Sequence, residues 1–125
     1  MVQLNKIVLD TNMLMAVGEL KIDVIEELKK FGKTEFFVPE EVIEELKKLK
    51  EKNRTKKINA EIAEKIIEKN CILIKSKTGN ADKKMEELAE QNYIIATNDK
   101  QLRTKIRKKG FKTAFVRQKK IIVLE

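Results

Sequence analysis

The sequence predicts a three-layer α/β/α fold built on a central, mainly parallel β-sheet. Short apolar runs rich in β-branched residues alternate with longer stretches of helical periodicity, a pattern typical of a parallel sheet covered by helices on both faces. The chain has 125 residues, of which 42% are hydrophobic, enough to bury a core. Because no linker, repeat or low-complexity tract divides the sequence, we expect residues 1–125 to form a single domain.

The N-terminal part is expected to contain two strands and the helices between them. Residues 6–9 are typical of a buried strand, and the helical stretches after it reach Phe31, where Gly32 suits a helix stop. Residues 35–38 form the second expected strand. Pro39 suits the first position of the next helix, because its missing N–H would have no partner there in any case.

Two helices and a third strand are expected in the middle of the chain. The helix after the second strand runs to about residue 52, and another covers about 55–69. Residues 71–75 form the third expected strand, and 76–79 a polar loop. Asn80 suits the N-cap of the following helix, because its side chain can accept a hydrogen bond from the first turn.

The C-terminal part is expected to add three strands and one helix. Residues 93–97 form a strand that leads into a basic helix ending at Gly110, and residues 111–116 and 121–124 form the last strands. In folds of this kind, ligands bind beyond the carboxyl ends of the strands, where the strand order reverses. The sequence therefore predicts where a site should lie before any residue is assigned to it.

Charge is distributed unevenly along the chain. Residues 1–45 carry 5 basic and 10 acidic residues, a net −5, whereas residues 46–125 carry 23 and 10, a net +13, which together give the overall +8. An acidic region beside a basic remainder suits a protein that binds metal next to a polyanion. Enrichment in Lys and Glu is also a hyperthermophile signal, so many of these charges have an explanation that requires no partner.

The sequence favours a cytoplasmic protein without membrane contact. Its apolar runs are a few residues long, against the roughly 20 needed to span a bilayer, and the N-terminus lacks the apolar block of a signal peptide. Cys71 is the single cysteine, so it has no internal disulfide partner and suits a reducing compartment. We expect it to be a small buried side chain and not a reactive group.

Four carboxylates are expected at one edge of the sheet. Asp10 ends the first strand, Asp99 follows the fourth, and Asp82 lies in the first turn of the helix after the third. Glu45 lies in the helix after the second strand, where, at ~100° per residue, it borders the apolar stripe while Glu44 points nearly opposite. The chain has 16 Glu but only four Asp, which suggests that Asp is used where a short, stiff carboxylate is needed, with helix capping or turn formation as the competing reason.

A cluster of these four acids predicts a divalent metal site. Ionised carboxylates repel one another unless a cation lies between them. The chain has no histidine and one cysteine, so the ligands are oxygens, which favours Mg²⁺ or Mn²⁺ over zinc. Such a site suits phosphodiester hydrolysis, because the metal lowers the pKa of a bound water and neutralises the leaving group. Taken singly, the acids other than Asp10 also suit helix caps or surface positions.

Two basic tracts begin beside the proposed ligands and predict contacts to RNA phosphates. One follows from the helix that carries Glu45, and the other follows Asp99. The predicted RNA-binding residues are Lys47, Lys48, Lys50, Lys100, Arg103 and Arg107. The five Phe and one Tyr lie mostly in or beside expected strands, so backbone recognition is expected to outweigh base stacking. A solvated face is the alternative for any single lysine.

Four short segments of the chain resemble motifs of the PIN-domain ribonuclease family. They are VLDTN (8–12), VPEEVIEELKKL (38–49), NADKKMEELA (80–89) and ATNDKQLR (96–103). The resemblance implies a PIN-like α/β fold and Mg²⁺- or Mn²⁺-dependent endoribonuclease activity. It assigns the catalytic and metal-binding roles to Asp10, Glu45, Asp82 and Asp99.

The resemblance also implies which polar residues support the acids. Asn12 and Thr97 match supporting positions of the family, and Asn98 lies beside them. Some family members carry further acids where this chain has Lys83 and Asn98, which leaves open whether one metal or two are bound. The family Glu stands directly before a Leu, and Glu45 fits that position where Glu44 does not.

Two biological settings follow from the resemblance. Small PIN proteins include VapC-type toxins, which pair with an antitoxin protein, and nucleases that process ribosomal RNA. The ending FKTAFVRQKKIIVLE is more similar to the archaeal rRNA-processing subgroup, which the sequence therefore favours slightly. The expected partners are RNA and either an antitoxin or a pre-ribosomal particle, and a homodimer is left open.

Two other classes of function compete with a nuclease. A non-catalytic RNA-binding or scaffold protein would keep the fold without turnover, but it would have no need of four mutually repelling acids. A phosphoacceptor receiver domain also has Asp at strand ends. However, Thr11 and Asn12 follow Asp10 where that class has paired acids, and the third expected strand ends at Lys75 without an Asp.

Overall fold

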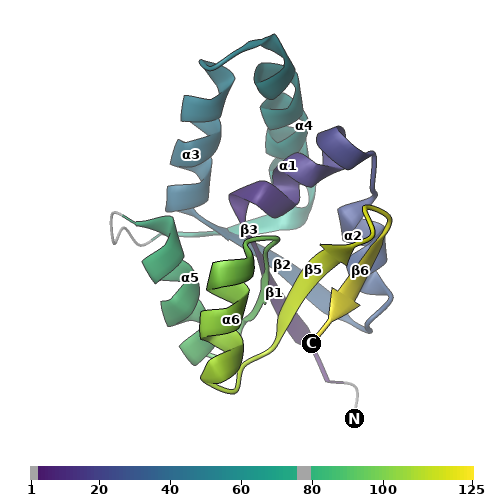
Figure 1. Ribbon diagram of the computed structural model, residues 1–125, viewed down its shortest axis with the longest axis vertical. Helices are drawn as coiled ribbons and strands as arrows, with labels where there is room; N and C mark the ends of the chain where they lie inside the picture. The colour runs from purple at the N-terminus through teal and green to yellow at the C-terminus, as the bar shows by residue number, and fades with distance from the viewer. Residues whose placement is uncertain (1–2, 76–79) are drawn as a thin grey trace.

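A six-stranded sheet ordered β3-β2-β1-β4-β5-β6 forms the centre of the molecule (Figure 1). The computed structural model describes residues 3–75 and 80–125. The strands are β1 (Asn5–Leu9), β2 (Thr34–Pro39), β3 (Cys71–Ile74), β4 (Ile94–Ala96), β5 (Thr113–Arg117) and β6 (Ile121–Leu124). Only β6 is antiparallel to its neighbour. The predicted mainly parallel sheet is therefore confirmed.

Helices flank the sheet, as the sequence predicts. They are α1 (Thr11–Leu20), α2 (Val24–Lys29), α3 (Glu40–Lys50), α4 (Arg54–Asn70), α5 (Ala81–Glu90) and α6 (Lys100–Lys108). Right-handed crossovers put α1 and α4 on one face and α5 and α6 on the other, and α1 packs on α4 while α5 packs on α6 (Figure 1).

The central strands are buried because helices cover both of their faces. Ile7, Val8 and Leu9 of β1 are at most 1% exposed, and Ile95 and Ala96 of β4 are fully buried. Such strands are apolar on both sides, which explains why they appear in the sequence as continuous hydrophobic runs.

The strand order reverses between β1 and β4, which lie side by side. The chain leaves β1 at Asp10, whose N–H donates to the carbonyl of Ala96 at 3.0 Å, and it leaves β4 at Thr97, whose N–H donates to Ala114 at 2.9 Å. The segments that follow β1 and β4 are thus held together at the carboxyl edge of the sheet, the place at which such folds bind ligands.

Several element boundaries differ from the predictions by a few residues. Pro39 is the N-cap of α3 and not its first helical residue, because it still pairs with Ile74 in β2 and has an extended ψ of 158°. The helical stretch before Gly32 breaks into α1 and α2 at Lys21, which has a left-handed φ of 56°. Gly32 itself has a φ of 122° in the turn to β2.

The C-terminal strand begins later than predicted. Gly110 has a φ of 89°, and β5 starts at Thr113, not at residue 111. The polar loop predicted at 76–79 lies outside the described residues. Cys71 is half-buried, less than expected, and burial raises the pKa of its thiol to about 12, so it remains an unreactive thiol.

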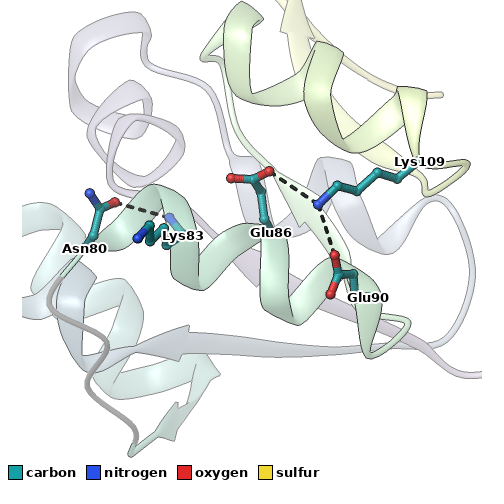
Figure 2. A network of polar contacts seen from close by, with 5 residues as sticks. All are labelled: Asn80, Lys83, Glu86, Glu90 and Lys109. Atoms are coloured by element: carbon teal, nitrogen blue, oxygen red, sulfur yellow. Dashed lines mark hydrogen bonds and ion pairs between the residues drawn. The ribbon is translucent and has the colours of Figure 1, made fainter.

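An exposed network of polar contacts ties α5 to α6 (Figure 2). Asn80 caps α5 by accepting a hydrogen bond from the N–H of Lys83 at 3.1 Å. Lys109, at the end of α6, contacts Glu86 at 3.5 Å and Glu90 at 2.9 Å on α5. The contacts of Lys109 connect α5, whose first turn contains Asp82, to α6, which Asp99 caps.

Over the described ranges, no helix combines the length and apolar character that crossing a membrane requires.

Candidate active site

Asp10 is the most buried of the four predicted acids, with 5% of its surface exposed. It is the N-cap of α1, and its Oδ1 accepts a hydrogen bond from the N–H of Thr11 at 2.8 Å. Its Oδ2 accepts from the hydroxyl of Thr97 at 2.7 Å and from the amide of Asn12 at 3.4 Å. These donors fix the carboxylate at the point where β1 ends.

The environment of Asp10 disfavours its charged form. Burial raises the pKa of Asp10 to about 6, the hydrogen bonds from Thr97 and Thr11 oppose this rise, and the nearby charges of Glu45 and Asp82 add to it. A buried carboxylate with further negative charge around it has too little compensation from the protein alone. The position is therefore suited to a cation.

The other three acids approach Asp10 from different elements. Glu45 on α3 accepts a hydrogen bond at Oε1 from the hydroxyl of Thr11 at 2.9 Å. Asp99 caps α6, and its Oδ1 accepts from the N–H groups of Gln101 and Leu102 at 2.9 and 3.2 Å. Asp82 lies exposed in the first turn of α5.

One pocket of about 290 Å³ brings all four acids together. Its lining consists of Asp10, Thr11, Asn12, Met15, Glu19, Glu45, Leu49, Lys56, Asp82 and Asp99. We call it the acidic pocket. A larger hollow of about 530 Å³ lies at the amino ends of β1 and β4, but no carboxylate lines it.

The four side chains line the acidic pocket without converging on one point. In the described part of the chain, no three His, Cys, Asp or Glu side chains are grouped closely enough to hold a metal ion as they stand. Glu45 and Asp82 are exposed, so their carboxylates are free to turn toward Asp10. The donor set, all oxygen around a buried carboxylate, fits Mg²⁺ or Mn²⁺.

The three predicted supporting residues form a connected network beside Asp10. Thr97 is fully buried and donates to Asp10. The side-chain oxygen of Asn12 accepts from the N–H of Asn98 at 2.8 Å, and the side-chain oxygen of Asn98 accepts from the N–H of Val116 on β5 at 2.8 Å. The network joins the ends of β1, β4 and β5 and so fixes the backbone on which two of the acids lie.

Two predicted RNA-binding residues form ion pairs with the protein itself. Lys50 contacts Glu64 on α4 at 3.1 Å, and Arg107 contacts Glu125 at 2.8 Å. Both pairs are partly exposed and join neighbouring elements. Contact of either residue with a phosphate would compete with these pairs.

Arg103 has a packing role that the sequence did not indicate. Its guanidinium carbon lies 3.9 Å from the centroid of the Phe115 ring, a cation–π contact between α6 and β5. The other three predicted RNA-binding residues are exposed and make no ion pair with any described residue: Lys47, Lys48 and Lys100. None of the six lines the acidic pocket.

The acidic pocket contains two charged residues that the sequence analysis did not assign to the site. Glu19 is on the face of α1 that carries Asn12 and Met15, so helical phase would have found it. Lys56, in the first turn of α4, is the only cation among the lining residues that the structure describes. No local pattern predicts that α4 docks there, because its contact with α1 joins segments far apart in the sequence.

Comparison with known proteins shows which family the chain belongs to. A family model described as a PIN like domain matches residues 7–119. The chain belongs to the PIN-domain ribonuclease family. The match spans the segments from β1 to the turn after β5 and so includes all four acids that the sequence predicted for the site.

Two curated PIN relatives have similar length and sequence. Ribonuclease VapC9 of Archaeoglobus fulgidus is 34% identical over 120 residues, covering 94% of this chain and 87% of that protein. Ribonuclease VapC4 of Methanocaldococcus jannaschii is 33% identical over 122 residues, covering 92% of each.

Solved structures show the same PIN fold. The PIN domain endonuclease Utp24 is similar with a TM-score of 0.78 and 28% identity, covering 96% of this chain and 90% of that one. A domain of a functionally unknown protein from Methanocaldococcus jannaschii has a TM-score of 0.67 at 22% identity, covering 90% and 91%. The second similarity concerns the fold alone.

The raised pKa of Asp10 predicts that the metal-free protein gains stability as the pH falls from 7 to 5. Above about pH 6 Asp10 is ionised in both the folded and unfolded states, and the folded state bears the full free-energy cost of a buried negative charge. Between pH 6 and the ordinary pKa of 3.8 only the folded state holds the proton, so at ~1.4 kcal/mol per pKa unit the free energy of unfolding rises by about 1.4 kcal/mol by pH 5 and by about 3 kcal/mol in total below pH 4.

Urea unfolding in EDTA at pH 7 and pH 5 would measure this effect. The Asp10→Asn protein, which has no charge to lose at that position, is the reference. An equal change of unfolding free energy in both proteins would contradict the prediction.

Proposed function

We propose that residues 1–125 act as a single-domain endoribonuclease that depends on Mg²⁺ or Mn²⁺. The observation that carries the proposal is the acidic pocket, in which three acids from separate elements, Glu45, Asp82 and Asp99, lie around the buried carboxylate of Asp10. The ribonuclease relatives support the same reaction class. A scaffold protein without turnover would gain nothing from the raised pKa of Asp10.

Asp10, Glu45, Asp82 and Asp99 would hold the cation. When bound, the metal supplies a more acidic water and offsets negative charge on the phosphodiester. Asp10 serves as the fixed ligand because three hydrogen bonds orient it. Glu45 and Asp82 are exposed and can adjust to the metal.

The chain's own residues would also orient RNA. Lys56 lies inside the acidic pocket and is placed to contact a phosphate next to the one that is cut. The exposed Lys47, Lys48 and Lys100 add positive charge outside it. Cleavage of single-stranded RNA is therefore expected to weaken steeply as salt concentration rises.

A matched pair of variants on α3 tests the proposal. Glu45→Gln removes a charge that lines the acidic pocket, so kcat/KM for single-stranded RNA in Mg²⁺ is expected to fall about 100-fold. Glu44→Gln makes the same chemical change one residue earlier, outside the acidic pocket, and should leave kcat/KM nearly unchanged. Equal losses in the two variants would speak against a site at Glu45.

The biological setting has two candidates with different support. The sequence relatives are ribonucleases named VapC, and their similarity supports a toxin that is held by an antitoxin. The C-terminal β5–β6 hairpin, whose sequence resembles that of the archaeal rRNA-processing subgroup, supports ribosomal RNA processing, and the similarity to the endonuclease Utp24 is compatible with either setting. A small antitoxin-like reading frame next to the gene would decide for the toxin, and selective cleavage of ribosomal precursor RNA would decide against it.

A further inference from the structure

A second hollow lies beside the acidic pocket, between α1 and the first turns of α4. Its volume is about 480 Å³, within the roughly 300–1,000 Å³ of ligand pockets. It is lined by Gly18, Glu19, Asn53, Thr55, Lys56 and Asn59. Glu19 and Lys56 also line the acidic pocket, so the two spaces adjoin. Figure 1 shows α1 and α4 side by side at this place.

Asn59 presents to the second hollow a side-chain amide that has no hydrogen-bond partner among the described residues. It is 8% exposed and lines the second hollow. Its side-chain amide makes no hydrogen bond within residues 3–75 and 80–125. Neither amide atom is among the fully enclosed polar atoms of the described residues that lack a partner, so a ligand in the second hollow can reach the amide and hydrogen-bond to it.

Gly18 gives Asn59 the space for this orientation. A Cβ at position 18 would lie 2.3 Å from Oδ1 and 2.9 Å from Cγ of Asn59, closer than atoms can approach. Glycine inside a helix is less favourable than alanine by about 1 kcal/mol. The missing side chain at Gly18 therefore lets the Asn59 amide lie directly against α1 at the second hollow.

We propose that the second hollow binds one nucleotide of single-stranded RNA next to the cleaved phosphate, and that Asn59 selects its base. The proposal rests on the endoribonuclease function proposed above. The amide offers both a donor and an acceptor, which is what the edge of an unpaired base requires. Lys56 lies where the phosphate between the two spaces would pass, since it lines both.

The chemistry of the lining favours recognition by hydrogen bonds. No aromatic side chain is among the residues of the second hollow, so stacking, which accepts every base, has no platform there. Among the described residues that line the second hollow, Lys56 is the only cation. A base preference at one position of the RNA is the expected consequence.

Binding measurements on the full chain with Asp10→Asn test the selection without cleavage. Fluorescence anisotropy with single-stranded RNAs that differ at one position should show about tenfold preference for one base at one position. Asn59→Ala and Gly18→Ala should each remove this preference, the first by deleting the amide and the second by displacing it.

Lys56→Ala should instead weaken binding of all these RNAs alike and reduce the slope of log K against log salt by about 0.7. Lys65→Ala is the matched control, because Lys65 is exposed on α4 and lines neither space. An equal effect of Lys65→Ala and Lys56→Ala would overturn the phosphate contact.

NMR of the protein without a substitution at Asn59 tests the subsite even if the Asn59 and Gly18 variants fail to fold. The side-chain NH₂ resonances of Asn59 should shift on titration with one of the four 5′-mononucleotides more than with the others. Resonances that none of the four moves, in a protein that still cleaves RNA in Mn²⁺, would overturn the subsite and leave the nuclease intact. Shifts and base preference in a wild-type protein that cuts no RNA would support the subsite and sink the nuclease.

Discussion

Asp10→Asn is expected to abolish RNA cleavage while the protein remains folded and still binds RNA. The substitution keeps the shape of the side chain but removes the buried charge that three hydrogen bonds hold at the end of β1. A metal contact worth several kcal/mol corresponds to a loss of roughly 10³-fold in kcat/KM, since about 1.4 kcal/mol changes a rate tenfold. Cleavage of a labelled single-stranded RNA in Mn²⁺ measures it.

Asp23→Asn is the matched control for this prediction. Asp23 is an exposed N-cap of α2 outside the acidic pocket, and asparagine can cap a helix equally well. It should leave both stability and cleavage near wild type. By contrast, Asp10→Asn should stabilise the metal-free protein at pH 7, because burial no longer opposes a charge there. Undiminished cleavage by Asp10→Asn would sink the assignment.

Thr97→Val is expected to produce the second large effect, through Asp10. The hydroxyl of Thr97 donates to Asp10 at 2.7 Å and accepts from the N–H of Asp99 at 3.2 Å, and both bonds are lost with valine. Since the bond to Thr97 lowers the pKa of Asp10, its loss raises that pKa further and favours the proton over a metal. Loss of such a supporting partner weakens metal binding by about 10–100-fold.

Calorimetric titration with Mn²⁺ at pH 7 measures this affinity, and Thr97→Ser should restore it because serine keeps the hydroxyl. Thr113→Val is the control for the shape change: Thr113 is also fully buried, but its hydroxyl has no hydrogen-bond partner among the described residues. Thr113→Val should bind Mn²⁺ like wild type. If Thr97→Val did so too, Thr97 would have no part in holding Asp10.

The sequence predicted those parts of the site that local periodicity determines. Asp10 follows the buried apolar strand β1, and Asp99 lies shortly after β4, so both acids were predicted at the carboxyl edge of the sheet. Helical phase placed Glu45 and not Glu44 toward the acidic pocket, and the hydrogen bond from Thr11 lies on that side. Each of these inferences needs only a few neighbouring residues.

Features that depend on how distant elements pack were beyond such reasoning. Lys56 and Asn59 reach the site because α4 docks on α1, a contact with no local signature. The contact of Arg103 with Phe115 on β5 likewise had no local signal, and the prediction that Arg103 binds RNA remains a prediction. The sequence predicted that the third helix starts at Pro39, one residue before it does, because Pro39 both ends β2 and caps α3.

The central claim is that Asp10, Glu45, Asp82 and Asp99 bind a divalent cation in the acidic pocket. Anomalous diffraction from crystals soaked in Mn²⁺ tests it most directly, since it locates the ion without reference to activity. A peak between Asp10, Glu45, Asp82 and Asp99 that disappears in crystals of the Asp10→Asn protein is the predicted result. Mn²⁺ peaks elsewhere on the molecule, with none in the acidic pocket, would contradict it.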